Sequence, residues 1–366
     1  MAMTPVTLDI QTNIAIINID NPPVNALSHS VREGIVSCIN QAEQDDRIKA
    51  IIIFCHGRTF IAGADITEFG KTPKEPHLPT VLAHINQCKK PVVAALFGTV
   101  LGGGFELALS CHYRVAVWGT KLGLPEVNLG LIPGAGGTQL LPRIAGVALA
   151  LEMISLGKMK KVEQLSDHKI IDLLITDVDI KNQDNNKDKS LLAQTVTFTE
   201  ELIKSNIPCK PIKQAPLILT PELTQLCQDW RTKLAKKSRG QQAPQCAINS
   251  IENSLLLTFD DAIKKERELF IQCRDSAQSS AMRHAFFAEK SAAKMKYITK
   301  PLTINSVAII GAGTMGGGIA MCFATAGINV TFLEMNQNNL DSGINAIAQR
   351  YQQAQLRGIM TVEQVD

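Results

Sequence analysis

The chain has 366 residues, of which 45% are hydrophobic and 19% are charged, and its formal net charge is +3. This length leaves room for two domains and part of a third, and the hydrophobic content excludes a largely disordered chain. The balanced charge argues against binding to nucleic acid, and apolar runs such as Pro91–Leu96 are far shorter than the roughly 20 residues of a membrane span.

The N-terminal half alternates short β-rich runs with helical segments. Met1–Ile19 is typical of a strand, because it lacks the basic leader and the continuous apolar core of a signal peptide. The predicted strands are Asn13–Ile19, Ala50–Cys55, Pro91–Leu96 and Tyr113–Val117, and the helices predicted between them include Ser30–Gln44 and Phe105–Ser110. This alternation indicates an α/β layer.

The polar stretch Thr176–Ser190 predicts a loop or surface edge, and the chain beyond it is typical of helices. Two apolar stripes recur there at helical spacing, and each predicts a face that packs on the core rather than a cofactor site. The first consists of Phe259, Ala262, Ile263, Glu266, Leu269, Phe270 and Cys273, and the second of Met282, Ala285, Phe286, Ala292 and Ala293. The basic run Arg231–Arg239 is better explained by a solvated helix face than by contacts with phosphates.

Cysteine and histidine usage predicts neither disulfides nor a metal centre. The nine cysteines are odd in number, contain no Cys-x-x-Cys pair and include Cys55 and Cys322 within apolar stretches, which favours buried thiols in a reducing, intracellular compartment. No metal is expected, because no second histidine or cysteine lies at ligand spacing from His56, His84, His112 or His168.

A different pattern begins near the C-terminus. The sequence there predicts a strand Ser306–Ile310, a helix from about Met315 to Ala326 and a second strand Asn329–Glu334. Between the first strand and the helix, Gly311-Ala312-Gly313-Thr314-Met315-Gly316 fits the G-x-G-x-x-G pattern of dinucleotide-binding turns. Such glycines let the backbone approach a pyrophosphate at a helix N-terminus, and Glu334 would accept hydrogen bonds from the adenosine ribose of NAD. The alternative is a purely structural turn between strand and helix.

The predicted cofactor-binding residues are therefore Gly311, Gly313, Thr314, Met315, Gly316 and Glu334. The residues from Pro301 onward are too few for a complete dinucleotide domain together with a substrate domain. We expect a βαβ segment that opens a further domain without its catalytic half.

Three segments of the first half have the composition of an active site. Phe60–Ile66 is an apolar turn after a strand, and Gly102–Glu106 is a glycine turn that leads into a helix. Leu124–Glu126 is followed by the glycine-rich run Pro133–Thr138.

Backbone and side-chain groups of these segments suggest proton-transfer chemistry. Gly103 would place an N–H group at a helix N-terminus, and a second N–H group from the turn at Ala64 could complete an oxyanion hole, each donor worth about 3–4 kcal/mol of barrier. Glu106 and Glu126 could act as an acid and a base. Two surface or capping glutamates explain the same pattern.

These segments resemble the enoyl-CoA hydratase/isomerase (crotonase) family over about Thr7 to Leu174. The resemblance rests on motifs in the family's order and spacing, namely Asn21–Leu27, Ala62–Ile66, Gly102–Glu106 and Pro133–Gln139. The multifunctional branch of the family is resembled in particular by Cys111–Ala116 and Ala285–Lys290. The chain is thus similar to the N-terminal part of a β-oxidation multifunctional enzyme, in which hydratase/isomerase precedes 3-hydroxyacyl-CoA dehydrogenase.

The resemblance implies an α/β fold of three parts. Residues 1–190 would form a crotonase-like spiral of ββα units, residues 191–300 a C-terminal helical extension and linker, and residues 301–366 a truncated Rossmann βαβ segment. The helices between Thr176 and Phe259 are hard to align with the family, so the wall that sets the acyl chain length is not predicted.

The resemblance also implies reversible syn hydration of trans-2-enoyl-CoA to 3-hydroxyacyl-CoA in fatty-acid β-oxidation. The N–H groups of Ala64 and Gly103 would hold the thioester oxygen, and Glu106 and Glu126 would hold the water that adds across C2=C3. Isomerisation of Δ3- to Δ2-enoyl-CoA is a second expected activity, with Glu126 alone moving the proton. CoA would bind mainly to the backbone of the turn that contains Ile61, Ala62, Asp65 and Ile66.

NAD would serve only the dehydrogenase half, whose catalytic His–Glu pair would lie beyond Asp366. Oxidation of 3-hydroxyacyl-CoA is therefore expected only of a complete parent protein. Two alternatives stay open: another crotonase chemistry such as thioester hydrolysis or decarboxylation, against which the two glutamates argue, and an acyl-CoA-binding scaffold that docks a thiolase or dehydrogenase subunit. The expected location is the bacterial cytoplasm, with peroxisome and mitochondrion as alternatives.

Overall fold

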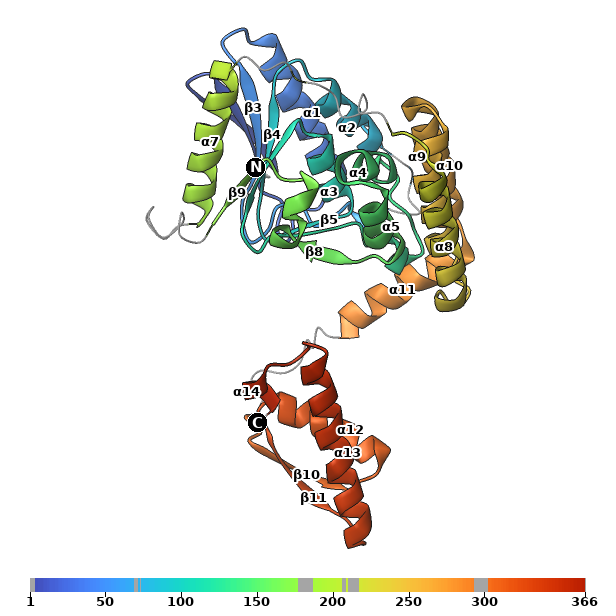
Figure 1. Cartoon of the computed structure of the whole chain (residues 1–366). Helices are drawn as coiled ribbons and strands as arrows, with labels where there is room; N and C mark the ends of the chain where they lie inside the picture. Colours follow the sequence, from blue (N-terminus) through green and yellow to red (C-terminus); the bar gives the residue numbers. More distant parts are fainter. Residues whose placement is uncertain are drawn as a thin grey trace. The chain divides into compact units, whose positions relative to one another are not determined.

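The computed structural model describes residues 4–68, 72, 74–176, 187–205, 209, 217–292 and 302–365. The chain divides into two compact units, Met1–Ser291 (unit 1) and Ala292–Asp366 (unit 2) (Figure 1). Among the described residues, no helix has the length and apolar character needed to cross a membrane.

Unit 1 is built around a six-stranded sheet with the strand order β1-β2-β3-β4-β6-β9. β1 and β2 form an antiparallel hairpin, and the pairs from β2 to β9 are parallel. Every residue of β2, β3 and β4 is buried, as expected of parallel strands that are covered on both faces. The strands are β1 (Val6–Gln11), β2 (Ile14–Ile19), β3 (Ala50–Cys55), β4 (Val92–Leu96), β6 (Tyr113–Val117) and β9 (Leu173–Ile175).

Helices cover both faces of this sheet. α7 (Lys187–Ser205) packs against β3 and β4 on one side, and α1 (His29–Gln44) lies on the other (Figure 1). α2 (Leu78–Gln87) packs between α1 and α3 (Gly103–Ser110), the helix that carries the first predicted glutamate.

A second sheet of three short strands, in the order β5-β7-β8, lies next to α3 in the chain and in space. Its strands are β5 (Thr99–Leu101), β7 (Lys121–Gly123) and β8 (Met159–Lys161), and the 3₁₀ helices of unit 1 are η1 (Ile66–Glu68), η2 (Glu126–Leu129) and η3 (Val162–His168). β5 ends directly before α3, so this sheet sets where that helix begins.

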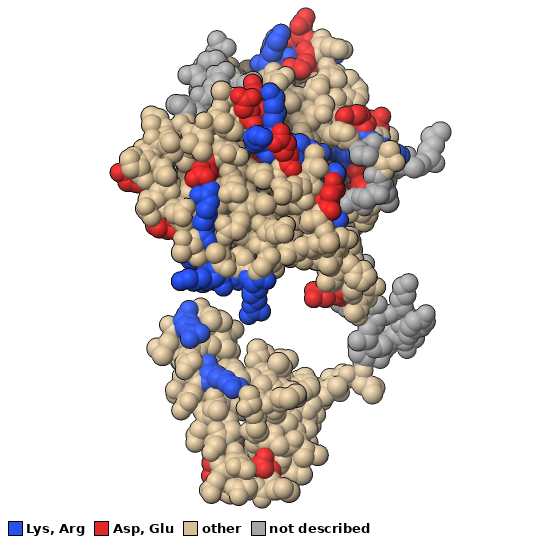
Figure 2. All heavy atoms as spheres, turned by 90° about the vertical axis from the view of Figure 1, so that its right-hand side faces the viewer, with Lys and Arg blue, Asp and Glu red and all other residues tan. Residues whose placement is uncertain are grey.

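Four helices form the C-terminal part of unit 1, and the first three of them pack on α4 (Gly137–Ala145) or α5 (Val147–Ser155). They are α8 (Pro221–Lys237), α9 (Ala243–Leu256), α10 (Phe259–Arg274) and α11 (Ala277–Ala292). α9 is the central helix of the group, since it contacts α4, α5, α8 and α10. On the face that carries α8 to α10, acidic and basic side chains lie next to one another (Figure 2), including the ion pairs Arg231–Glu252 and Lys265–Glu268.

Unit 2 contains a βαβ segment in which the two strands pair in parallel, with Ile310 opposite Leu333. Its elements are β10 (Ser306–Ile310), α12 (Thr314–Thr325), β11 (Asn329–Leu333), α13 (Gln337–Leu356) and α14 (Val362–Val365). So small a unit buries few side chains, and Ile310 and Leu333 are exposed. Cys322, which the sequence predicts to be buried, is exposed for the same reason.

Most predicted elements are confirmed to within two residues at each end, and Ala50–Cys55, Tyr113–Val117 and Ser306–Ile310 match at both ends. The loop predicted over Thr176–Ser190 is wrong at its end. Residues 177–186 lie outside the described residues, but α7 already begins at Lys187. Ser190 and Leu191 are buried there, so packing of α7 on the sheet outweighs the polar composition.

The first predicted stripe is confirmed on α10, where Ala262, Glu266, Phe270 and Cys273 are buried. The second stripe is wrong for the described part of α11, in which Ser279 is the only buried residue. The first two turns of α11 contact the rest of unit 1: the Ser279 hydroxyl donates to the carbonyl oxygen of Leu129 at 2.9 Å, and the sulfur of Met282 lies beside Gly130. Ala293, the last residue of that stripe, lies outside the described residues.

Candidate active site

The turn that follows β3 positions a free backbone amide at Ala64. Hydrogen bonds fix its course: the N–H of Ala62 donates to Val24 O at 3.1 Å, and the N–H of Leu27 donates to Gly63 O at 3.0 Å. Gly63 has a φ of +127°, a conformation that residues with a side chain rarely adopt. Among the described residues, the N–H of Ala64 has no protein acceptor.

The N-terminus of α3 brings a second amide beside the first. Gly102 precedes the helix with a φ of +52°, and its N–H donates to Gly123 O at 3.0 Å. A Cβ on Gly103 would lie 3.4 Å from the nitrogen of Ala64, so the two backbone segments are in close contact. The N–H of Gly103 opens the helix and, within the described part of the chain, also lacks a protein acceptor. Two adjacent free donors, one of them at a helix N-terminus, are suited to an oxyanion.

Glu106 lies in the first turn of α3 and is 3% exposed. Its Oε1 accepts hydrogen bonds from the N–H groups of Ala135 at 2.8 Å and Gly137 at 2.9 Å, at the start of α4. Burial raises the pKa of Glu106, while these two N–H groups and the Arg267 guanidinium act to lower it. The surface alternative is therefore wrong for Glu106, although its carboxyl group does cap the start of α4.

Glu126 is the first residue of η2, and its carboxyl group lies against the glycine turn. A Cβ on Gly102 would come within 3.2 Å of its Oε1. Its Oε2 is shielded from solvent and has no hydrogen-bond partner among the described residues. Burial, followed by the charge of Glu106, raises the pKa of Glu126 well above its ordinary range. A shielded carboxylate oxygen without a hydrogen-bond partner destabilises the fold, unless the group is protonated or a ligand donates a hydrogen bond to it.

The surroundings of the two carboxyl groups differ in a way that separates their proton affinities. Glu106 has two N–H donors and a nearby guanidinium that favour its ionised form. The pKa of Glu126 is raised by burial and further by the negative charge of Glu106, and its Oε2 has no hydrogen-bond partner among the described residues. Two carboxyl groups whose pKa values are separated in this way are suited to act as a base and an acid.

A further buried glutamate, Glu266 of α10, is absent from the predicted site. It is 1% exposed, and it accepts hydrogen bonds from the N–H groups of Gly136 at 2.6 Å and Thr138 at 2.9 Å. Burial, followed by the charge of Glu106, raises its pKa to about 8. Its signal in the sequence is a charged residue within an otherwise apolar helical stripe, because an acid is rarely buried without partners.

The residues predicted to bind CoA lie in the turn that also contains Ala64. Ile61 is fully buried, so its side chain belongs to the core. Ala62 and Ile66 are partly exposed. Asp65 caps η1, since its Oδ1 accepts from the N–H of Thr67 at 3.0 Å and from the hydroxyl of that residue at 2.7 Å.

A buried arginine that the sequence does not predict holds this turn in place. Arg32 of α1 forms an ion pair with Glu68 of η1 at 2.9 Å. It also donates to the carbonyl oxygens of Leu27 at 2.8 Å and Pro76 at 2.9 Å. The end of the turn is thereby tied to α1.

In unit 2 the predicted dinucleotide turn has a suitable backbone. Gly311 has a φ of +95°, and a Cβ on Gly316 would overlap the carbonyl oxygen of Gly311, so only glycine fits there. Glu334 follows β11, and its Oε2 accepts from the N–H of Ala312 at 2.9 Å. This bond lowers the pKa of Glu334 and keeps it ionised. The residues where α12 begins are the predicted Gly313, Thr314 and Met315.

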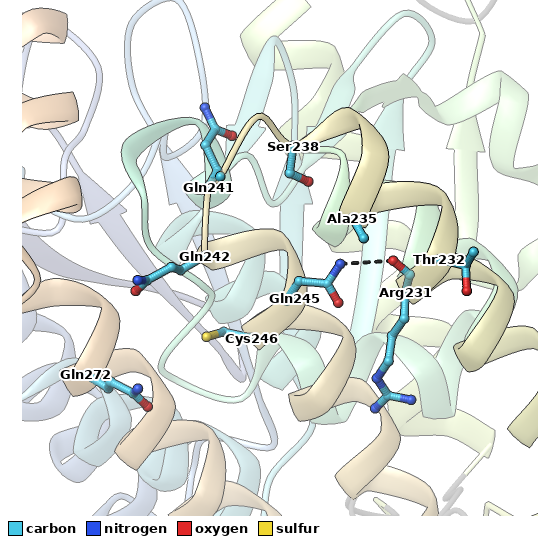
Figure 3. A pocket seen from close by; sticks show the side chains of 10 residues that line it. Arg231, Thr232, Ala235, Ser238, Gln241, Gln242, Gln245, Cys246 and Gln272 are labelled. Atoms are coloured by element: carbon cyan, nitrogen blue, oxygen red, sulfur yellow. Dashed lines mark hydrogen bonds between the residues drawn. The ribbon is translucent and has the colours of Figure 1, made fainter.

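A separate cavity of about 660 Å³ lies at α8, α9 and α10 and contains none of the predicted site residues. Figure 3 shows Gln245 directed toward α8, where its Nε2 donates to the carbonyl oxygen of Arg231 at 3.0 Å. Arg231 is the charged residue among those that line the cavity, and it is already paired with Glu252.

Two protein families match successive parts of the chain. Residues 9–206 match enoyl-CoA hydratase/isomerase. Residues 306–366 match the NAD binding domain of 3-hydroxyacyl-CoA dehydrogenase. The helices α8 to α11 belong to neither match.

The curated relatives include proteins named as bifunctional or multifunctional enzymes. The peroxisomal bifunctional enzyme of Danio rerio is 35% identical over 341 residues, which cover 91% of this chain and 46% of the relative. That of Homo sapiens is 36% identical over 336 residues, with 89% and 45% covered. The peroxisomal fatty acid beta-oxidation multifunctional protein AIM1 of Arabidopsis thaliana is 33% identical over 371 residues, with 97% and 50% covered. The chain thus spans about half the length of these relatives.

Solved structures confirm the predicted crotonase fold. The carnitinyl-CoA hydratase of Mycobacterium avium superposes with a TM-score of 0.58 at 22% identity, covering 79% of this chain and 97% of that one. The enoyl-CoA hydratase/isomerase of Pseudoalteromonas atlantica T6c gives a TM-score of 0.57 at 20% identity, covering 78% and 97%. From the family match over more than half of its residues, the chain belongs to the enoyl-CoA hydratase/isomerase family.

Proposed function

We propose that this chain catalyses the reversible syn hydration of trans-2-enoyl-CoA to 3-hydroxyacyl-CoA in fatty-acid β-oxidation. The observation that carries the proposal is the pair of buried Glu106 and Glu126, whose Oε2 is shielded from solvent, together with the free N–H groups of Ala64 and Gly103. Hydration needs two proton-transfer groups and a site for an oxyanion, and these residues supply both. Thioester hydrolysis and decarboxylation give no reason for the second glutamate.

In this mechanism the N–H groups of Ala64 and Gly103 donate to the thioester oxygen of the substrate. Glu106, the carboxyl group with the stronger hydrogen-bond support, takes a proton from water while the water oxygen bonds to C3. The electrons of C2=C3 move toward the thioester oxygen, and the resulting enolate is held by the two N–H groups. Glu126 delivers its proton to C2, and the proton on Glu106 passes back to Glu126, which completes the addition of one water.

The same site supports isomerisation of Δ3- to Δ2-enoyl-CoA as a second activity. In its ionised form Glu126 would remove a proton from C2, while Ala64 and Gly103 hold the enolate. It would then return the proton at C4. Glu106 has no proton to move in this reaction, so the two activities differ in their need for it.

The test is the loss of the conjugated enoyl-thioester absorbance when the purified chain is mixed with a short trans-2-enoyl-CoA. We expect Glu126→Gln to lower kcat by about 10²–10⁴-fold, the range of general acid–base catalysis. Glu33→Gln, at an exposed position of α1, is the matched control and should keep the wild-type rate. Binding of acyl-CoA without any hydration by the wild-type chain would overturn the proposal and favour the scaffold alternative.

We further propose that unit 2 forms the first part of an NAD site. A Cβ at Gly313 would meet nothing within 4 Å, so the backbone is open to a ligand there. The glycine turn with Thr314 and Met315 would hold the pyrophosphate at the start of α12, and Glu334 would accept from the ribose. NAD supplies a hydride acceptor when bound. Because the chain spans about half of its relatives, oxidation of 3-hydroxyacyl-CoA is proposed only for a longer parent protein.

The same relatives support proposals on CoA binding, on the domain organisation of the chain and on its location in the cell. CoA would lie along the turn with Ile61, Ala62, Asp65 and Ile66. Residues 1–190, 191–300 and 301–366 are proposed as hydratase core, helical extension and start of the NAD-binding domain. The names of the relatives favour a peroxisome over the bacterial cytoplasm. A thiolase or dehydrogenase subunit is a proposed partner.

A further inference from the structure

Four successive backbone N–H groups at the start of α4 donate hydrogen bonds alternately to two buried carboxyl groups. Those of Ala135 and Gly137 donate to Glu106, at 2.8 and 2.9 Å. Those of Gly136 and Thr138 donate to Glu266, at 2.6 and 2.9 Å. The segment is therefore held from two sides, by α3 through Glu106 and by α10 through Glu266.

The surroundings of this segment tie it to the C-terminal helices. A Cβ on Gly134 would overlap the ring of Phe270, so α10 lies directly on the backbone. The hydroxyl of Thr138 donates to Glu266 and lies 2.7 Å from the hydroxyl oxygen of Ser250 on α9. Thr138, Ser250 and Glu266 are all buried, so the network is formed away from solvent. Movement of α10 would move the donors that hold Glu106.

The ionised form of the buried Glu266 carboxyl group has an electrostatic cost in this place. Charges within a dry site repel strongly, and the charge of Glu266 acts on Glu126 just as that of Glu106 acts on Glu266. An uncharged residue could fill the same volume without that repulsion. The arrangement of its hydrogen bonds indicates what offsets the cost, because Glu266 accepts from every second N–H group and leaves the others aimed at Glu106.

We propose that Glu266 is a positioning residue for hydration: it fixes the Pro133–Thr138 segment so that the N–H groups of Ala135 and Gly137 hold Glu106 in place. This inference rests on the proposed hydratase function. Glu266 lies outside residues 9–206, which match the family. The hydratase site of this chain is therefore completed by a helix that the family match does not include.

The test is a double-mutant cycle on the full chain, because a residue that acts through Glu106 has no further effect once Glu106 is disabled. Hydration is measured for the wild type, Glu266→Gln, Glu106→Gln and the double variant. We expect Glu266→Gln to lower kcat by about 10–100-fold with KM changed less than about threefold, since a misplaced group costs turnover more than binding. The double variant should match Glu106→Gln. Glu268→Gln, on the exposed side of α10, is the matched control and should keep the wild-type rate.

The outcomes separate this inference from the proposed function. If the wild type is active and Glu266→Gln keeps its rate, the inference alone is overturned. The inference is also overturned if Glu266→Gln lowers kcat by the same factor in the Glu106→Gln background as in the wild type. A wild-type chain without hydration overturns the proposed function and the inference with it. Where Glu266→Gln does not fold, Glu266→Asp takes its place in the cycle, since it keeps the carboxyl group and shortens the side chain by one methylene. Its loss of rate should likewise vanish in the Glu106→Gln background.

Discussion

The helices α3 of unit 1 and α12 of unit 2 begin in the same way. Each follows a strand and a glycine turn, and each has a glycine in its first turn that lies against a backbone carbonyl. A Cβ on Gly104 would overlap the oxygen of Ile61, and a Cβ on Gly316 would overlap that of Gly311. In both units glycine thus allows a helix N-terminus to approach the neighbouring backbone.

The difference lies in what surrounds the two helices. All residues of α3 are buried, whereas α12 buries only Gly317 and Ala320 among its residues. The pKa values of the nearby acids shift in opposite directions: burial raises the pKa of Glu106, while partly exposed Glu334 accepts an N–H hydrogen bond that lowers its pKa. The surroundings of one turn are therefore suited to proton transfer, and those of the other to an ionised hydrogen-bond acceptor.

The largest expected effect sharpens this contrast at Glu106. Glu106→Gln removes the group proposed to accept the proton of water, so hydration should fall by at least about 100-fold. Isomerisation, proposed to need only Glu126, should fall far less. Both activities are measured on the same preparation, with short trans-2- and cis-3-enoyl-CoA substrates. Equal losses of the two activities would contradict the separate roles given to the two glutamates.

The next effect concerns stability and compares the two glycine contacts. Gly104→Ala should destabilise unit 1 by about 1–3 kcal/mol, because the added methyl group meets a backbone oxygen that cannot move away. Gly316→Ala should destabilise only unit 2. Hydrogen exchange of the intact chain can assign each loss to its unit. A Gly104→Ala chain with unchanged exchange in β3 and β4 would show that this contact is not tight.

The sequence could predict the parts of the site that depend on local motifs. Ala64, Gly103 and Glu106 lie within short segments whose glycine and acid spacing carries their meaning, and the structure brings these segments together. Glu266 could not be assigned in that way, since it meets Gly136 across 130 residues of chain. Only its place in the apolar stripe of α10 marked it as unusual.

The fold shows the same division. Strands of five or six residues, such as β3 and β6, have enough β-branched content to be predicted. β5, β7, β8 and β9 have three residues each, too few for any periodicity, and they exist because their neighbours pair with them. Burial of α7 likewise depends on the sheet it covers rather than on its own composition.

A dependence of stability on pH is also expected. The folded chain holds a proton on Glu266 more firmly than an unfolded chain does, since its pKa rises from 4.5 to about 8. This contribution to stability is complete below about pH 4.5 and is lost as the pH rises toward 8, by at most about 1.4 kcal/mol per pH unit. Glu266→Gln should therefore show a flatter fall of the free energy of unfolding over this range in denaturant titrations. Parallel curves for the two chains would mean that Glu266 does not change its proton affinity on folding.

The smallest effect tests how loosely α12 packs against the rest of unit 2. Gly318 lies inside α12, and a Cβ there would meet nothing within 4 Å, in contrast to Gly104 and Gly316. Gly318→Ala should stabilise unit 2 by about 0.5–1 kcal/mol, because alanine loses less conformational freedom than glycine when a helix forms. Slower hydrogen exchange in β10 and β11, with unchanged exchange in unit 1, is the expected result. Faster exchange would mean that α12 packs more closely than its exposed residues indicate, and the two helices would then differ less than their burial suggests.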